Sequence, residues 1–292
     1  MYEPEVTIIT PTYNIVESGH ADDFTLLVNL TDRQTYQYVE HLIVDNNSTD
    51  ETIDLLKDYK NSGFINFYSA PDTGKYDAIN KGLLRAKGKY VAFLSCDDFY
   101  HDIMAISDLV NAMEEENADY CIFPSYCVNP DGSAFLYNPS ILNVFQVMPC
   151  PHQAMFFKRE ALEKLGYFDA KFKIFADYDL ILRLVLGRFN GIMFDRPIVT
   201  YKMGEQALKH SIQVEAECRH IYYKNLKPLY QLNDTQIDRM VKVSEIPKGL
   251  LDRLAGYFPD SKDLFYERYE QMYNMRYQAA EAQREQQRQN RQ

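Results

Sequence analysis

The chain has 292 residues, of which 46% are hydrophobic and 25% charged, and its formal net charge is −11. These values are typical of a soluble globular protein, and the negative charge argues against a nucleic-acid groove or a broadly anionic membrane partner. No apolar run approaches the length of about 18 residues that a membrane span needs, and we expect no signal peptide. The five irregularly spaced cysteines indicate reduced thiols in the cytoplasm.

The first 125 residues alternate short apolar runs with amphipathic segments. These runs predict strands at 6–10, 41–45, 64–68, 89–95 and 119–123, with helices over 21–34, 49–60, 75–87 and 102–117. Either Ser48 or Thr49 is expected to cap the second helix. Strands separated by helices of 10–15 residues are typical of a parallel sheet, so this part should form a Rossmann-like layer.

The pattern changes after Pro124. The turn sequence at 129–132 predicts a hairpin, followed by strands at 153–158 and 192–201 and helices at 158–165 and 177–187. From about residue 210 the chain is expected to be mostly helical. Residues 278–292 lack apolar periodicity, which predicts a frayed or disordered tail.

Two adjacent carboxylates, Asp97 and Asp98, follow the buried strand that begins at Tyr90. Ligands of open α/β sheets bind outside the carboxyl ends of the strands, so chemistry is expected there. Adjacent carboxylates repel each other unless a cation or proton lies between them, and hard oxygen ligands suit Mg²⁺ or Mn²⁺. The alternative is that the pair only starts a loop and caps the next helix.

Polar residues follow the other strands too, and all should meet at one edge of the sheet. Asp45 can accept the N3–H of uracil, Tyr13 can stack on a base, and Lys75 lies near a helix N-terminus where phosphate binds. Their structural alternatives are a turn former, a core aromatic and a solvated charge. Neither G-x-G-x-x-G nor G-x-x-x-x-G-K-[ST] follows a strand, which excludes dinucleotide-binding and P-loop proteins.

Four ordered segments resemble the core of family 2 glycosyltransferases, which have the GT-A fold and transfer a sugar from a nucleotide sugar with inversion. These segments are 6–14, 44–50, 72–98 and 175–184, and the resemblance covers roughly residues 5–205. It departs from the family pattern at two places. Ser95 stands where an acidic residue often begins the metal motif, and Ala176 stands where many relatives have Glu.

The resemblance implies a role for each strand-end residue. The nucleotide-sugar ligands would be Pro11, Tyr13, Asn14, Asp45, Asn47, Asp72, Gly74, Lys75, Asp77 and Asp97, and among these Pro11, Tyr13 and Asp45 hold the base. Asp97 and Asp98 correspond to the metal-binding motif. Asp177 corresponds to the catalytic base, at a helix start where the macrodipole favours a carboxylate and where Asp also serves as a cap.

Cys150-Pro-His152-Gln153 resembles the Cys-His-Gln segment of soluble bacterial members of this family. His152, Gln153 and Asp179 are therefore candidates to contact the acceptor or donor sugar. The alternative for His152 is a structural histidine with its hydrogen bonds satisfied inside the protein.

The sequence thus predicts an α/β protein of GT-A fold, with a Rossmann-like, mostly parallel sheet flanked by helices and a helical C-terminal extension. Residues 1–125 would bind the nucleotide sugar, 126–209 would form the acceptor and catalytic half, 210–277 the extension and 278–292 the tail.

The expected activity is that of an inverting hexosyl- or N-acetylhexosaminyltransferase that uses Mn²⁺ or Mg²⁺. It would act on a UDP-sugar and a glycan or lipid-linked acceptor, in surface polysaccharide biosynthesis, in the cytoplasm or at the inner face of the membrane. The alternatives are a catalytically silent nucleotide-sugar-binding protein and a nucleotidyltransferase. The latter would need a Gly-rich basic loop after the first strand, which residues 11–17 do not provide.

A stripe of apolar and aromatic residues recurs at helical spacing near the C-terminus, and it needs an apolar surface to cover it. The stripe consists of Phe265, Tyr269, Met272 and Tyr273, with Arg276 one turn further on. It can pack on the rest of its own chain, form a homodimer contact, or dock on a membrane or a partner enzyme.

Overall fold

The structure, a computed structural model, describes residues 5–203 and 211–289. These residues form two compact units. The first contains 5–139, 150–177 and 189–203, and the second contains 140–149, 178–188 and 211–289. The units interleave along the chain, whereas the sequence predicts segments that follow one another, because 140–149 and 178–188 pack with the C-terminal helices.

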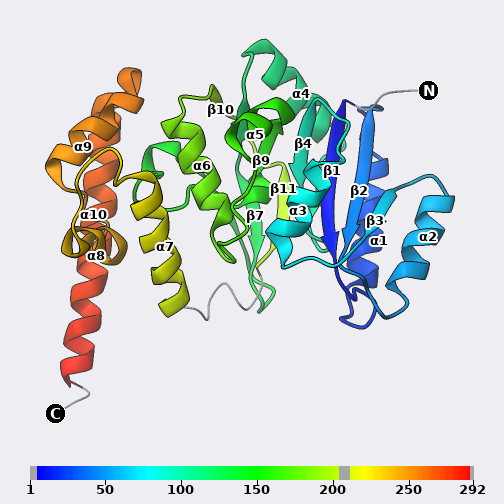
Figure 1. The fold of residues 1–292 in the computed structure, drawn as a ribbon, viewed down its shortest axis with the longest axis horizontal. Coiled ribbons are helices and arrows are strands. Elements are labelled where there is room, and N and C mark those ends of the chain that lie inside the picture. The colour runs from blue at the N-terminus through cyan, green and yellow to red at the C-terminus, as the bar shows by residue number, and fades with distance from the viewer. Residues whose placement is uncertain (1–4, 204–210, 290–292) are drawn as a thin grey trace. The chain divides into compact units, whose positions relative to one another are not determined.

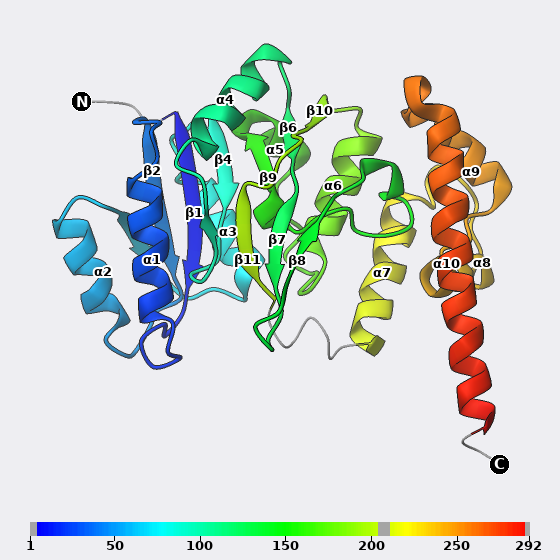
Figure 2. The same cartoon turned by 180° about the vertical axis from the view of Figure 1, so that it is seen from behind.

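The first unit is built on a sheet with the strand order β10-β6-β9-β4-β1-β2-β3, whose strands can be followed in Figures 1 and 2. Neighbouring strands are parallel except at β9, which pairs antiparallel with β4 and β6. The predicted mostly parallel sheet is therefore confirmed. Its strands are β1 (Val6–Thr12), β2 (Val39–Asp45), β3 (Asn66–Ser69), β4 (Tyr90–Phe93), β6 (Tyr120–Ile122), β9 (Met155–Lys158) and β10 (Gly191–Met193).

A smaller sheet in the same unit has the order β5-β11-β7-β8. Its strands are β5 (Phe99–Tyr100), β7 (Ser125–Val128), β8 (Ala134–Tyr137) and β11 (Val199–Lys202). β7 and β8 form the predicted hairpin. The single strand predicted over 192–201 is wrong, since its two parts, β10 and β11, belong to different sheets. Pro197 lies between them and has no backbone N–H with which to continue a ladder.

Helices cover the seven-stranded sheet, with α1 and α3 on opposite faces (Figures 1 and 2). The predicted cap of α2 is wrong: α2 begins after Glu51, because Ser48 bonds Asp45 and Thr49 bonds Asn14. The helices that begin in this unit are α1 (Ala21–Asp32), α2 (Thr52–Asn61), α3 (Lys75–Leu83), α4 (Ala105–Glu115), α5 (Arg159–Leu165) and α6 (Ala176–Leu186).

Helix α3 approaches the sheet closely at Gly82. A Cβ at this position would lie 2.5 Å from Ile9 Cγ2 and 3.1 Å from Val44 Cγ2, so a larger residue would push α3 away from β1 and β2. The buried face of α3 includes Tyr76 and Ile79. This close contact holds the last turn of α3 against β1 and β2.

The second unit contains α7 (Ser211–Asn225), α8 (Asp234–Val243), α9 (Lys248–Leu254) and α10 (Lys262–Gln289). The aromatic stripe packs within this unit. Phe265 is buried, with its ring 6.2 Å from Phe145 and 5.4 Å from Phe258. Arg276 donates hydrogen bonds to Ser244 Oγ and to the carbonyl of Val241.

Helix α10 differs from the sequence prediction at its C-terminal end. It continues to Gln289, through most of the segment 278–292 that was expected to be frayed. Nearly all side chains of 278–289 are exposed. Gln, Ala, Glu and Arg have high helix propensity, so the helix continues here without an apolar face to bury.

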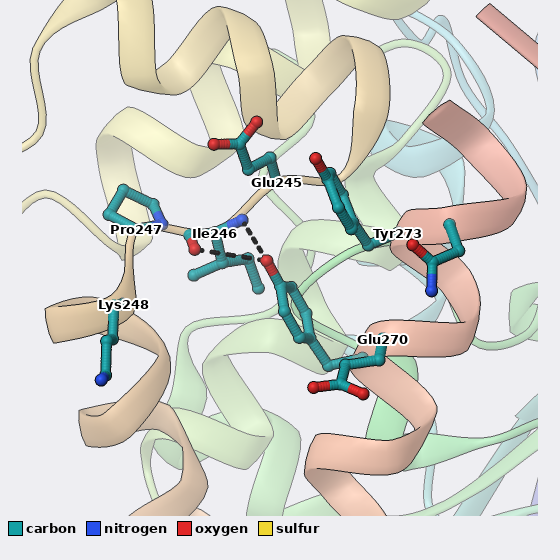
Figure 3. A pocket seen from close by; sticks show the side chains of 8 residues that line it. Glu245, Ile246, Pro247, Lys248, Glu270 and Tyr273 are labelled. Carbon is teal, nitrogen blue, oxygen red and sulfur yellow. Dashed lines mark hydrogen bonds between the residues drawn. The ribbon is translucent and has the colours of Figure 1, made fainter. Parts of the chain in front are cut away.

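An open pocket of about 460 Å³ lies in the second unit (Figure 3). The Tyr269 hydroxyl accepts a hydrogen bond from the Ile246 N–H at 3.2 Å, and the rings of Tyr269 and Tyr273 stack with their centroids 6.2 Å apart. Two residues of the predicted stripe therefore line this pocket. The lining residues are Glu245, Ile246, Pro247, Lys248, Tyr269, Glu270, Tyr273 and Asn274.

All five cysteines are free thiols, as predicted. Of the helices within 5–203 and 211–289, none is both long and apolar enough to cross a membrane.

Candidate active site

The ends of β1, β2 and β3 lie side by side because the three strands are parallel. Pro11 pairs with Val44 and Thr12 with Asp45, and Asp45 in turn pairs with Ser69 at the end of β3. Strand β4 runs parallel to β1 on its other side, so the residues that follow β4 reach the same edge. The register thus gathers the strand ends that the sequence analysis singled out.

Asp45 organises the loops at this edge. Its carboxylate accepts hydrogen bonds from the Ser48 N–H (3.0 Å) and hydroxyl, from Ser69 Oγ (2.6 Å) and from Thr12 Oγ1 (3.3 Å). It has no exposed surface, and a buried carboxylate is stable only with such donors. The structure thus gives Asp45 a loop-organising role, and the contact with a nucleobase stays a prediction.

The loops after β1 and β2 are tied to each other. The Asn14 side chain accepts a hydrogen bond from the Thr49 N–H at 2.9 Å, and the Asn14 N–H donates to Ser48 Oγ at 2.8 Å. Asn14 and Asn47 both have a positive φ, near 45°, which asparagine tolerates better than most residues. Tyr13 is 58% exposed and Asn47 is also exposed, so these two offer accessible side chains at the edge.

The segment 72–77 leads into α3. The Asp72 carboxylate accepts a hydrogen bond from the Gly74 N–H at 2.9 Å, and the Asp72 N–H donates to Asn46 Oδ1 at 2.7 Å. Gly74 has φ 131°, a conformation that side chains other than glycine rarely adopt. Burial raises the pKa of Asp72, and the charge of Asp77 adds to this effect. Asp77 itself is paired with Lys81 at 3.0 Å on the same helix.

The two adjacent carboxylates differ in their surroundings. Asp98 has no exposed surface and accepts hydrogen bonds from the Ser95 N–H (2.7 Å), Gln153 Nε2 (3.0 Å) and the Lys202 N–H (3.3 Å). Burial, followed by the charge of Asp97, raises the pKa of Asp98 to about 6. Asp97 is partly exposed, and its pKa is raised by burial as well. Asp97 therefore presents the accessible carboxylate and Asp98 the internal one.

Asp97 and Asp98 can hold a divalent cation only if a bound phosphate or water molecules supply its remaining ligands. Across 5–203 and 211–289, no group of three or more His, Cys, Asp or Glu is arranged to hold a metal ion. Burial and then the charge of Asp97 raise the pKa of Asp98, and a cation beside the two carboxylates would favour their ionised forms. Mg²⁺ usually takes one or two carboxylates and completes its shell with waters and substrate phosphates. The pair is thus suited to a cation that arrives with a diphosphate.

Asp177 and His152 form a buried pair. His152 Nδ1 lies 3.1 Å from Asp177 Oδ2, and the two side chains are 3% and 5% exposed. Asp177 is the second residue of α6, where the helix macrodipole favours negative charge. Burial lowers the pKa of His152, and the positive charge of Lys75 lowers it further, so the imidazole is neutral.

Lys75, the first residue of α3, lies near both groups of carboxylates. Its side chain reaches solvent, with Nζ 4.7 Å from the centroid of the Tyr76 ring, although many protein atoms surround it. This crowding lowers the pKa of the ammonium, whereas the charges of Asp177 and Asp98 act to raise it. One accessible cation is therefore close to both acids.

Two of the residues predicted to contact a sugar have other partners here. Gln153 donates to Asp98 and so supports the acidic pair. Asp179 belongs to the second unit, has no exposed surface, and accepts from Arg183 Nε (2.8 Å), Lys224 Nζ (3.0 Å) and Asn225 Nδ2 (2.9 Å). Asp179 therefore anchors α6 to α7. The sequence contained a sign of this role, because Arg183 follows Asp179 by one helical turn.

Sequence reasoning missed the residues that hold the acids in place. Asn46, Ser69 and the backbone of Lys202 each bond one of the strand-end carboxylates or their loops. A polar residue at a strand end is a common feature, so only the register identifies these as partners.

The mostly parallel seven-stranded sheet with helices on both faces defines a protein of the GT-A fold. Residues 7–168, more than half of the chain, match Glycosyl transferase family 2, and the chain belongs to this family. The predicted family and GT-A fold are confirmed.

Two curated relatives are similar to this chain. An uncharacterized glycosyltransferase of Mycobacterium tuberculosis is 28% identical over 188 residues, which cover 63% of this chain and 70% of that protein. The PGL/p-HBAD biosynthesis glycosyltransferase of Mycobacterium bovis is 27% identical over 189 residues, with the same coverage of 63% and 70%.

Among solved structures, S. aureus TarS 1–349 in complex with UDP-GlcNAc has a TM-score of 0.63 at 17% identity, covering 97% of this chain and 92% of that one. The match to a longer TarS chain spans 50% of its length. The mannosyltransferase PcManGT from Pyrobaculum calidifontis, in complex with GDP-Man and Mn²⁺, has a TM-score of 0.59 at 16% identity and covers 91% and 74%. At these identities the likeness concerns the fold.

Proposed function

We propose that this glycosyltransferase inverts the anomeric centre as it moves a hexosyl or N-acetylhexosaminyl group from a UDP-sugar to a glycan or lipid-linked hydroxyl. The observation that carries the proposal is the placement of Asp177. Its carboxylate is held by His152 at the N-terminus of α6, and Lys75 lies close to both Asp177 and Asp98. A base for the attacking hydroxyl and charges for a departing diphosphate are thus present in one group of residues.

Each residue then has a role in a direct displacement. Asp177 takes the proton of the acceptor hydroxyl as that oxygen attacks the anomeric carbon, and the bond to the diphosphate breaks on the opposite face. Lys75 stabilises the negative charge that develops on the phosphates. Asp97, supported by Asp98, would hold Mn²⁺ or Mg²⁺, whose charge neutralises the leaving diphosphate. Tyr13 offers a ring on which uracil can stack.

The similar proteins support the choice of ligands. The TarS complex contains UDP-GlcNAc, so UDP-sugars are the first donors to test, and the PcManGT complex contains Mn²⁺. The relative named for PGL/p-HBAD biosynthesis is in keeping with a lipid-linked or glycan acceptor. We further propose that the chain acts in polysaccharide biosynthesis, in the cytoplasm or at the inner face of the membrane.

The test is the release of nucleoside diphosphate from a panel of UDP- and GDP-sugars, with water as the acceptor, in Mn²⁺, Mg²⁺ or EDTA. We expect metal-dependent release from a UDP-sugar. Asp177→Asn should bind UDP as the parent does. It should cleave UDP from the donor sugar at least about 100-fold more slowly, since the amide cannot take the proton. Asp54→Asn, an exposed carboxylate on α2, is the control and should be unaffected.

Two outcomes contradict the proposal. Binding of nucleotide sugars without release, in the parent as in Asp177→Asn, indicates a silent nucleotide-sugar-binding protein. Formation of a nucleotide sugar from a nucleoside triphosphate and a sugar phosphate indicates a nucleotidyltransferase.

A further inference from the structure

Aromatic side chains hold the ring of His152 in place. Its centroid lies 5.9 Å from that of Tyr76 on α3 and 6.5 Å from that of Phe93 in β4. Tyr76 and Phe93 both pack against Phe168, at 5.5 Å and 5.3 Å. His152 follows Pro151 in a short helical turn and is almost fully buried. The imidazole thus has little freedom to rotate, and its Nδ1 stays directed at Asp177.

The proposed function fixes the direction of the hydrogen bond between His152 and Asp177. Its base is an ionised carboxylate, which only accepts hydrogen bonds, so the proton between Nδ1 and Oδ2 is assigned to His152. Because burial and the charge of Lys75 keep the imidazole neutral, Nε2 carries no proton. The pair therefore consists of one tautomer of a neutral histidine and an ionised aspartate.

We propose that His152 is a positioning residue for the proton transfer: its Nδ1–H fixes the Asp177 carboxylate through Oδ2 and favours the ionised form. This inference rests on the proposed function, in which Asp177 is the base. A hydrogen bond donated to the charged form of a carboxylate favours that form, so Asp177 remains able to take a proton at lower pH. A carboxylate fixed in advance also needs no reorganisation when the acceptor hydroxyl arrives.

The reverse assignment, with His152 as the base and Asp177 orienting it, is less favourable. A base must hold the proton that it takes, and an imidazolium at His152 would be both buried and close to the ammonium of Lys75. Asp177 instead becomes neutral when it takes a proton, which burial tolerates.

Two substitutions of His152 test the proposal. His152→Leu keeps apolar bulk but removes the donor, whereas His152→Asn places an N–H near the position of Nδ1. With the donor that the parent hydrolyses, we expect His152→Leu to lower kcat about 10- to 100-fold, the effect of a lost charge-assisted hydrogen bond, with KM and the Kd for UDP unchanged within about twofold. The acid limb of its kcat profile should move up by about one pH unit, and His152→Asn should recover most of the loss.

Parental kcat and pH profile in His152→Leu would overturn the proposal. So would equal losses in the Leu and Asn variants, which indicate that the imidazole itself takes the proton. If His152→Leu fails to bind UDP, the test is His152→Asn against the parent. An Asn variant with less than about a tenth of the parental kcat then overturns the proposal.

Nitrogen-15 NMR of histidine-labelled protein gives a readout that needs no turnover. We expect the signal that disappears in His152→Leu to be a neutral Nδ1–H tautomer at pH 7 to 8, and a protonated or Nε2–H form would overturn the proposal. Failure of the inference differs from failure of the function. A parent that releases no nucleotide from any donor refutes the proposed function and the role of His152 with it, whereas an active parent with an unaffected Leu variant refutes the inference alone.

Discussion

His41 makes the stability of this protein depend on pH. It lies on β2 with 4% of its surface exposed, and burial lowers its pKa from 6.5 to about 3. His41 Nε2 lies 3.0 Å from Thr10 Oγ1, whereas the buried Nδ1 has no hydrogen-bond partner among the residues that the structure describes. The ring is therefore neutral in the folded protein. The perturbation that tests this is His41→Gln, which keeps a polar group near Nε2 but does not titrate.

The magnitude follows from the lowered pKa. Below pH 6.5 the unfolded chain binds a proton that the folded protein does not, so the free energy of unfolding decreases as the pH falls towards 3. Above pH 6.5 the contribution is fully retained. At about 1.4 kcal/mol per pKa unit, the loss is about 2 kcal/mol at pH 5 and approaches about 5 kcal/mol below pH 3.

Urea unfolding at pH 7, 6 and 5 measures this loss, followed by circular dichroism because the chain has no tryptophan. Between pH 7 and pH 5, the parent should lose about 2 kcal/mol more than His41→Gln, since all other titrating groups are shared. His20→Gln, at a more exposed histidine, is the control and should follow the parent. Parallel losses in the parent and His41→Gln would refute the reasoning.

Four further predictions concern the site and the packing. Asp45→Ala should lower the free energy of unfolding by about 2–3 kcal/mol in urea, because the buried Thr12 hydroxyl and the partly buried Ser69 hydroxyl lose their acceptor. An unchanged midpoint would show that these hydrogen bonds contribute little. Asp97→Asn should fold normally but lose the part of its UDP affinity that depends on Mn²⁺, measured by calorimetry. If the parent binds UDP equally well in EDTA and in Mn²⁺, the metal has no role in binding. Gly82→Ala should cost about 1–3 kcal/mol, since its Cβ overlaps Ile9; a melting temperature equal to the parent's would show that the contact yields easily. Phe265→Ala should cost about 3–4 kcal/mol without changing the mass in light scattering, and a changed mass would indicate that the stripe also joins two copies.

The spacing of apolar residues located the helices and strands of the first unit, because each of them buries side chains at regular intervals along the sequence. The apolar run at 89–95 contains β4, and the alternation of strands and helices up to residue 123 predicted the parallel sheet. The positions of Asp97 and Asp98 after β4 followed from the same pattern. Boundaries and caps were less predictable: α2 begins after Glu51 because Ser48 is already bonded to Asp45, a contact between the ends of two elements.

Other features depended on contacts between distant residues. Asp179 and Asp177 are two residues apart on one helix, yet Asp179 is paired within the second unit and Asp177 with His152 of the first. The only local signal that distinguishes the two acids is Arg183, one turn after Asp179, because the other partners named here for the two acids lie 25 to 46 residues away.

The sequence by itself determined which strands end in acids and how the chain alternates between strand and helix, since these follow from side-chain polarity and local spacing. Only the tertiary structure decided which acids are accessible and which are held inside. Asp45 receives donors from one loop and from the ends of two neighbouring strands, β1 and β3. Asp98 is buried and bonded by Gln153, while Asp97 remains partly exposed. The reason is physical: burial and hydrogen-bond partners of a carboxylate are set by strand register and packing, which join residues that the linear sequence keeps apart.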